Sequence, residues 1–282
     1  MLEIQNLSHI YNPGTPFERV ALDNINLSIR RGEFIGVIGH TGSGKSTLIQ
    51  HLNAMLKPTS GQILLDGEDI FADKKKLKSV RQRVGLVFQY PEHQLFEENI
   101  FKDVAFGPTN MGLSPDEIDS RVREALHLVG ISEDMYEKSP FELSGGQKRR
   151  AAIAGVLAMK PEVLVLDEPI AGLDPAGRDA ILGQISDMHE IVGNTVILVS
   201  HNMEDVSRLA DRIVVMAHGR MILCGTPAEV FAEPDKLREV GLAPPPIAAL
   251  MDRLRQEGVF PGNIPQGIFT IEDAADFLRG II

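Results

Sequence analysis

Residues 39–47 read Gly39-His40-Thr41-Gly42-Ser43-Gly44-Lys45-Ser46-Thr47, and each of them is a candidate contact for a bound nucleotide. The apolar run Phe34 to Ile38 precedes this turn and a predicted helix, Ser46 to Leu56, follows it. In this context a glycine-rich turn cradles phosphates, because its backbone N–H groups and the helix N-terminus face the anion. In the same pattern, Lys45 would reach the terminal phosphates of the ligand and Ser46 could ligate Mg²⁺.

Apolar, β-rich runs alternate with helical stretches on both sides of this loop. Strands are predicted at Phe34 to Ile38, Val84 to Phe88, Val163 to Leu166, Val196 to Val199 and Ile213 to Met216. Helices are predicted at Ser46 to Leu56, Pro115 to Val129, Gly146 to Met159 and Gly177 to Val192. Short, nearly all-apolar strands alternating with helices indicate an α/β fold with a parallel sheet covered on both faces.

Three other regions depart from this alternation. Met1 to Leu7 and Leu22 to Ile29 alternate as strands do and fit an antiparallel side sheet. The mainly helical insertion from about Phe96 to Pro140, with the helix after it, predicts a helical subdomain at about residues 96–155. Residues 1–243 would then be one nucleotide-binding domain.

Prolines at 244, 245 and 246 separate a tail, so residues 244–282 are predicted to form a small C-terminal domain. Helical spacing relates the apolar residues Ile247, Leu250, Met251 and Leu254. Thr270 with Asp273 predicts the start of a final helix that carries Phe277 and Leu278.

Composition limits the possible partners and compartments. The 282 residues include 28 basic and 39 acidic ones, a formal net charge of −11, so no nucleic-acid partner is expected. Neither a secretory signal nor an apolar run of about 20 residues is apparent, so any membrane connection is expected to go through a partner. The lone Cys224 is expected to be a buried small hydrophobe in a reducing compartment. A basic cluster at 74–83 is interpreted as a solvated surface.

A pair of acidic residues ends the predicted strand Val163 to Leu166. The carboxyl ends of parallel strands are where α/β proteins place groups that handle ligands. Asp167 is therefore a candidate for the Mg²⁺ shell. Glu168 is a candidate for orienting or deprotonating the water that attacks the γ-phosphate.

Leu143-Ser144-Gly145-Gly146-Gln147 lies directly before a predicted helix, and other phosphate-loop enzymes do not carry it. With this motif the chain resembles the ATP-binding cassette (ABC) ATPases. The resemblance implies that two cassettes close head to tail over two ATP molecules. Ser144, Gly145, Gly146 and Gln147 would contact the nucleotide held by the opposite subunit, and the serine would also cap its own helix.

The resemblance covers Leu2 to about Glu233 and assigns the remaining site positions. Gln89 would sense Mg²⁺ and the attacking water and link the nucleotide to a membrane partner. His201 would contact the γ-phosphate, and Asp174, in the segment Ala171 to Asp174, would lie in the loop that crosses the dimer interface. Tyr11 resembles the aromatic residue that stacks on adenine, although a single tyrosine near a strand end is as often core or surface.

One subgroup of ABC ATPases stands out. The segments Phe88 to Phe96 and Asp103 to Pro108 are similar to the ATPases of energy-coupling factor (ECF) importers, which take up vitamins or nickel and cobalt ions. The resemblance implies a second ATPase, identical or paralogous, a transmembrane coupling protein, a substrate-binding membrane protein, and a place at the cytoplasmic face of the cell membrane. It also implies that the C-terminal domain contacts the second ATPase. The residues Tyr90, Leu95, Phe96 and Phe101 would either line a groove for the coupling protein or lie in the core.

Two other classes remain as alternatives. A soluble ABC ATPase that acts on ribosomes or DNA usually has two cassettes or a long coiled coil, and neither is present in this sequence. A GTP switch or small-molecule kinase shares only the phosphate loop, and this chain has no Asn-Lys-x-Asp sequence. The importer ATPase therefore accounts for more of the motifs.

Overall fold

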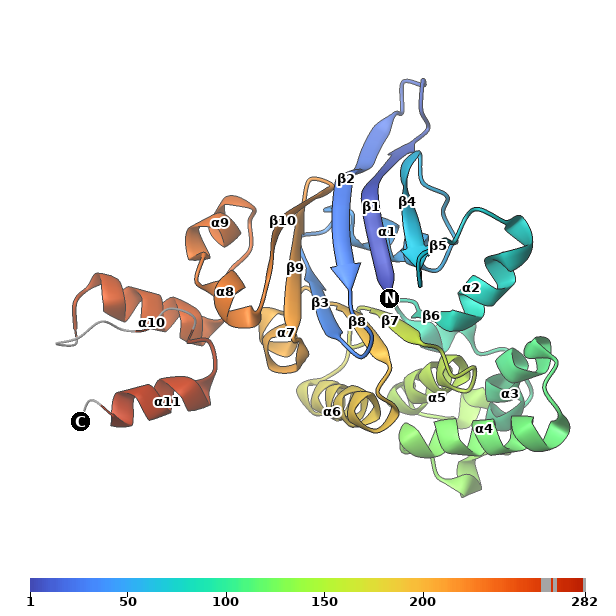
Figure 1. Ribbon diagram of the computed structural model, residues 1–282. Coiled ribbons are helices and arrows are strands. Elements are labelled where there is room, and N and C mark those ends of the chain that lie inside the picture. Colours follow the sequence, from blue (N-terminus) through green and yellow to red (C-terminus); the bar gives the residue numbers. More distant parts are fainter. Residues whose placement is uncertain (260–264, 266–267, 281–282) are drawn as a thin grey trace.

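The computed structural model describes residues 1–259, 265 and 268–280, and the strands among them form two sheets (Figure 1). In chain order the strands are Leu2–Tyr11 (β1), Arg19–Ile29 (β2), Phe34–Ile38 (β3), Ser60–Leu65 (β4), Glu68–Asp69 (β5), Val84–Val87 (β6), Val163–Asp167 (β7), Thr195–Val199 (β8), Arg212–Ala217 (β9) and Arg220–Gly225 (β10). All predicted strands are thereby confirmed.

In the part of the chain that the structure describes, α-helices and four 3-10 turns connect the strands. The helices are Lys45–Leu52 (α1), Leu77–Arg83 (α2), Ile100–Met111 (α3), Pro115–Leu128 (α4), Gly145–Leu157 (α5), Pro175–Val192 (α6), Met203–Leu209 (α7), Pro227–Phe231 (α8), Pro234–Glu239 (α9), Pro246–Gln256 (α10) and Ile271–Arg279 (α11). The 3-10 turns are Lys74–Lys76 (η1), Pro91–Gln94 (η2), Glu133–Met135 (η3) and Pro140–Glu142 (η4).

The larger sheet has the strand order β10-β9-β3-β8-β7-β6 among the described residues. All neighbours from β9 to β6 are parallel, and β10 pairs antiparallel with β9 at one edge. β3, β7 and β8 are buried along their whole length, as expected for strands covered on both faces. Because the strands are parallel, the segments after β3, β6, β7 and β8 all leave at one edge, where the predicted site residues lie.

Different layers cover the two faces of this sheet (Figure 1). One face packs on α1 and on the second sheet, whose order is β2-β1-β4-β5 and whose pairs are all antiparallel. The side sheet predicted from the first thirty residues is thereby confirmed. The other face packs on residues of α5, α6 and α7, and this core continues into α3 and α4. The predicted α/β fold with an antiparallel sheet and a helical region is therefore present.

The C-terminal tail forms two helices, α10 and α11, beyond α8 and α9 and at the far end of the molecule from α3 and α4 (Figure 1). Met251 and Ala274 are the buried centre of this helix pair. Thr270 caps α11, accepting a hydrogen bond from the backbone N–H of Asp273 at 3.0 Å, as the sequence predicts. Leu250, which shares the predicted apolar spacing, is instead 49% exposed.

The prediction for Cys224 is wrong, because its side chain is exposed. Cys224 lies on β10, the edge strand of the larger sheet, where exposure alternates along the strand. Ile222, two residues earlier, also faces outward. An apolar run can therefore form a strand that is covered on one face only.

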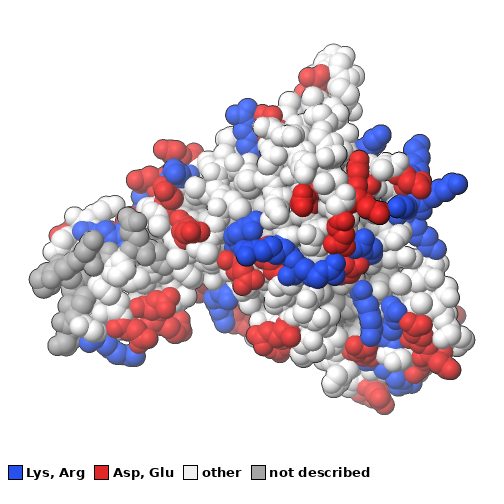
Figure 2. Space-filling view, viewed as in Figure 1, with Lys and Arg blue, Asp and Glu red and all other residues white. Residues whose placement is uncertain are grey.

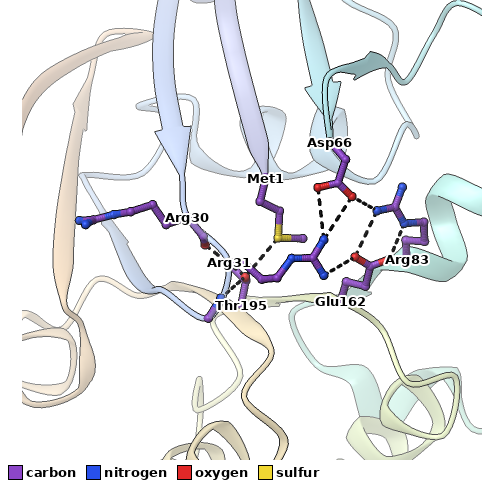
Figure 3. A network of polar contacts seen from close by, with 8 residues as sticks. Met1, Arg30, Arg31, Asp66, Arg83, Glu162 and Thr195 are labelled. Atoms are coloured by element: carbon purple, nitrogen blue, oxygen red, sulfur yellow. Dashed lines mark hydrogen bonds and ion pairs between the residues drawn. The ribbon is translucent and has the colours of Figure 1, made fainter.

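A network of arginines and carboxylates joins the two sheets at the end opposite to the phosphate loop (Figure 3). Arg83 bonds to Glu162 before β7 and to Asp66 in the turn after β4, and Arg31 before β3 bonds to both of these carboxylates. Hydrogen bonds from Arg83 lower the pKa of Glu162. Arg83 belongs to the basic cluster, so part of that cluster is structural, whereas Lys74 to Lys76 are exposed as predicted.

Replacing Arg83 with methionine should lower the free energy of unfolding by about 1 kcal/mol, since it removes the centre of this half-exposed network. The effect should shrink as pH falls below about 4.5, because a carboxylate with a lowered pKa in the folded state stabilises above its ordinary pKa and loses that contribution below it. Urea unfolding at neutral and at acidic pH measures the change in the free energy of unfolding and its dependence on pH. Lys102→Met, which breaks only the exposed pair with Glu98, is the control and should leave the midpoint unchanged.

Charges of both signs are mixed over the face drawn in Figure 2, where a row of basic side chains across the middle is bordered by acidic ones. In the described part of the chain, no helix is both long enough and apolar enough to cross a membrane.

Candidate nucleotide site

The phosphate loop connects the buried end of β3 to the first turn of α1. Gly42 and Gly44 adopt φ angles of 79° and 107°, which favour glycine. A Cβ on Gly44 would lie 2.6 Å from the carbonyl oxygen of Ala21, so a larger residue does not fit there. Ser43 is fully buried and does not line the pocket, so its hydroxyl is not a candidate phosphate contact. The loop presents backbone N–H groups at the start of a helix, as a phosphate cradle requires.

Lys45 is 7% exposed, and its ammonium group lies against the loop itself. Nζ donates hydrogen bonds to the carbonyl oxygens of Gly39 at 2.7 Å and His40 at 3.1 Å. Burial lowers the pKa of Lys45, while the nearby charges of Glu168 and Asp167 oppose that shift. The lysine is thus held in place by the loop, beside the acidic pair.

The acidic pair follows β7, next to the loop. Asp167 is 9% exposed and accepts a hydrogen bond from the Ser46 side chain. Burial and the negative charge of Glu168 raise the pKa of Asp167, against the effects of Ser46 and Lys45. An electropositive ligand at this position would relieve the unfavourable burial of the carboxylate.

The three candidate catalytic residues meet at Glu168. Gln89 Nε2 donates to Glu168 Oε2 at 3.1 Å, and His201 Nδ1 lies 3.5 Å from the same oxygen. Glu168 has a φ angle of 47°, unusual for a residue with a side chain, so its backbone is turned at the point where the strand ends. The structure therefore brings together residues that lie far apart in the sequence.

A pocket of about 350 Å³ lies over these groups. Its lining residues are Tyr11, Arg19, Ala21, Thr41, Gly42, Gly44, Lys45, Ser46, Thr47, Gln89 and Glu168. The Tyr11 hydroxyl lies 3.3 Å from Thr47 Oγ1, so the tyrosine is at the rim of the phosphate loop. This position is consistent with a flat base stacking on its ring beyond the phosphates.

Sequence reasoning missed Arg19. It pairs with Tyr11 across the β1–β2 hairpin, and its Nη2 lies 3.3 Å from the point that a Cβ on Gly42 would occupy. Among the described residues, no hydrogen bond or ion pair holds its guanidinium. The hairpin register was the signal that could have found it, since Tyr11 and Arg19 are cross-strand neighbours.

Arg19→Ala should raise the KM for ATP about fivefold and leave kcat nearly unchanged. An exposed cation over the loop is worth roughly 1 kcal/mol in phosphate attraction, and this attraction is the same in the ground and transition states. Steady-state hydrolysis at varied ATP measures the two constants. Arg30→Ala, at a surface arginine outside the pocket, is the control and should change neither KM nor kcat. An unaltered KM in the Arg19 variant would show that the Arg19 guanidinium does not reach the nucleotide.

The segment Ser144 to Gln147 is not part of this pocket. Ser144 caps α5 by accepting from the Gln147 backbone N–H at 3.3 Å, while its own N–H donates to Gln147 Oε1 at 2.9 Å. Ser144 and Gly145 are exposed. Asp174 likewise caps α6, at 2.7 Å from the backbone nitrogen of Gly177, and lies outside the pocket. Neither Ser144 to Gln147 nor Asp174 therefore lines the nucleotide pocket of its own chain.

A larger groove of about 930 Å³ lies between α2, α3 and α5. Leu95 and Phe96 are among its lining residues, and Phe96 is 62% exposed. Of the other two aromatic candidates, Phe101 packs against the core of the helical region, and Tyr90 is 41% exposed outside the groove. Spacing along the chain did not separate these roles, because the segment turns at Tyr90, whose φ is 56°.

Comparison with known proteins agrees with this geometry. Residues 22–171 match the sequence profile of the family described as ABC transporter. The energy-coupling factor transporter ATP-binding protein EcfA2 of Clostridium tetani is 58% identical over 274 residues, 97% of this chain and 94% of that protein. EcfA2 of Caldanaerobacter subterraneus is 56% identical, over 99% of this chain and 98% of that protein.

Solved structures show the same likeness. CbiO1 of Clostridium perfringens, described as part of the ABC transporter complex cbiONQ, superposes with a TM-score of 0.76 at 45% identity, over 89% of this chain and 98% of that one. The ATP-binding cassette MJ0796, in a dimeric post-hydrolysis state bound to ADP and Pi, gives a TM-score of 0.71 at 29% identity, over 80% of this chain and 98% of that one.

Proposed function

This chain belongs to the ABC transporter family as an ATP-hydrolysing subunit of the energy-coupling factor type, and from that premise we propose that it powers an importer of vitamins or transition-metal ions by ATP-dependent closure of a dimer. One observation carries the proposal. The pocket gathers Lys45, Gln89 and Glu168, yet the exposed Ser144 lies outside it. Each subunit thus offers two half-sites, and a second ATPase, identical or paralogous, would complete both.

Closure would bring Ser144, Gly145, Gly146 and Gln147 of one subunit to the γ-phosphate held by the other. The first turn of α5 supports this role, because exposed backbone N–H groups at a helix start attract an anion. Asp174 would lie at the same interface. The C-terminal helices α10 and α11 would add a contact between the subunits.

Mg²⁺ fits the oxygen donors at the pocket: the Ser46 hydroxyl, the Asp167 carboxylate and the Gln89 amide oxygen. When bound it would neutralise charge on the phosphates of ATP. The raised pKa of Asp167 supports the assignment, since burial and the charge of Glu168 outweigh the effects of Ser46 and Lys45 on this carboxylate.

Glu168 would orient the attacking water and accept its proton, because its carboxylate lies at the pocket and, among the described residues, forms no ion pair with an arginine or lysine. His201, whose Nδ1 lies near Glu168 Oε2, would contact the γ-phosphate. Gln89, bonded to Glu168, would contact Mg²⁺ and the attacking water and so link the state of the site to the membrane partner. Lys45 and the loop N–H groups would bind the phosphates, and Tyr11 would stack on adenine.

The groove supports a role for a membrane partner. Its walls carry apolar side chains, such as Leu77, Phe88 and Phe106, and it opens next to Gln94 and Leu95, a few residues past Gln89. A helix of a transmembrane coupling protein would fit there and place this subunit at the cytoplasmic face of the membrane. The solute would be selected by a separate substrate-binding membrane protein.

The test is affinity purification of this chain from native membranes, followed by identification of the proteins that come with it. We expect a second ATPase and integral membrane proteins. Phe96→Asp, which places a charge in the groove, should lose the membrane proteins but retain the second ATPase. Recovery of ribosomes, without any membrane protein, would instead favour a soluble ABC ATPase.

A further inference from the structure

Arg149 is a buried arginine in the first half of α5, and its guanidinium bonds to two other segments, so that it joins three parts of the chain. Its Nε and Nη2 donate to the two carboxylate oxygens of Glu92 at 3.0 and 2.6 Å. Its Nη1 donates to the carbonyl oxygens of Pro169 at 3.1 Å and Ala171 at 2.8 Å. The side chain is 3% exposed, so these contacts replace water almost completely.

The arrangement is specific to arginine. A planar fork binds the Glu92 carboxylate with two parallel bonds while its remaining N–H groups reach carbonyls in other directions. Burial alone would raise the pKa of Glu92, but the hydrogen bonds and charge of Arg149 lower it, so the pair stays ionised. The guanidinium also lies 5.9 Å from the centre of the Tyr90 ring. Removal of either partner would leave a buried charge without compensation.

Each of the three segments leads to a different part of the proposed machinery. α5 begins directly after the cap residue Ser144, and Gly155 and Val156 near its end line the groove. Glu92 lies on η2, between Gln89 and the groove. Pro169 to Ala171 directly follow Glu168. One side chain therefore connects the helix that would face the partner's ATP with both loops that meet at Glu168.

We propose that Arg149 is a positioning residue that makes α5, the Gln89 loop and the segment after Glu168 move as one unit. The inference rests on the proposed function, because only a dimer that opens and closes needs such a unit. Arg149 itself lines neither the nucleotide pocket nor the groove. Its effect on hydrolysis would pass through Gln89 and Glu168, whose geometry depends on the loops it holds.

The test compares Glu92→Gln and Arg149→Lys with the double variant in the full-length chain, under conditions in which the wild type hydrolyses ATP. Each single variant should lower kcat about tenfold, since small misplacements of catalytic groups cost at least that much, while the Kd for ATP stays within about twofold. The double variant should be no slower than the worse single one, because both changes break the same link.

Arg178→Lys is the matched control. Arg178 forms a comparable ion pair with the buried Asp205 at 2.5 Å and joins α6 to α7, and in the described part of the chain its side chain bonds to Asp205 rather than to any of the three segments. We expect this variant to lower Tm without lowering kcat. If Glu92→Gln also changes only Tm, Arg149 is a structural residue and the inference is wrong. A wild-type chain that neither binds nor hydrolyses ATP would instead contradict the proposed function.

Discussion

Glu168→Gln is expected to lower kcat for ATP hydrolysis at least about 100-fold while the Kd for ATP stays nearly unchanged, because loss of a general base costs roughly 10² to 10⁴ in rate. The amide keeps the size of the side chain and can still bond to Gln89, but it cannot take a proton from water. Binding should be spared because, under the proposed function, the phosphates would rest on Lys45 and the loop N–H groups, which line the same pocket. Steady-state hydrolysis and equilibrium binding of ATP separate the two effects.

The same variant should accumulate as a closed dimer when ATP is present, since hydrolysis is the step that would reopen it. Size-exclusion chromatography with and without ATP detects this change. Glu190→Gln, at an exposed position on α6, should hydrolyse ATP at the wild-type rate and remain unaffected by ATP in the column. Hydrolysis retained in Glu168→Gln would exclude Glu168 as the catalytic carboxylate.

The sequence predicted those parts of the fold in which a single local pattern, such as an apolar run or a glycine-rich turn, determines the conformation. β3, β7 and β8 are short apolar runs buried on both faces, and such runs leave little choice of conformation. The phosphate loop follows from glycines that only a tight turn requires. By contrast, β4 reads Ser-Gly-Gln-Ile-Leu-Leu and gives no strand signal in its first half, because that half is ordered by pairing with β1.

The parts of the site that sequence reasoning missed depend on contacts between distant segments. Arg19 lies over the loop only because β2 returns beside β1. Arg149 belongs to an unremarkable basic stretch, and its role appears only when Glu92 and the carbonyl of Ala171 are placed around it. The exposure of Cys224 depends on β10 being an edge strand. Local patterns predict elements, whereas these assignments need the register of the sheets and the packing of α5.

Lys45→Ala is expected to weaken ATP binding roughly 30-fold to several thousand-fold, the range that corresponds to the loss of a buried charge contact worth 2–5 kcal/mol. The ammonium is 7% exposed and already lies against the loop carbonyls of Gly39 and His40, so it needs little reorganisation to meet a phosphate. Its loss would also remove a positive charge that interacts with Asp167 and Glu168, and these carboxylates would then repel the nucleotide more strongly.

A loss of ATP affinity in Lys45→Ala can be distinguished from a folding defect by measuring Tm as well as the Kd for ATP. Lys57→Ala removes an exposed lysine a few residues after α1 and should leave the Kd for ATP unchanged, whereas Lys45→Ala should lose binding even where its Tm equals that of the wild type. Relief of the buried positive charge can even raise Tm in the absence of nucleotide, because burial disfavours the charged lysine. Loss of affinity together with an unchanged or higher Tm would mark Lys45 as a residue kept for phosphate binding. An unchanged ATP affinity would instead show that the assignment of residues 39–47 as the phosphate-binding loop is wrong.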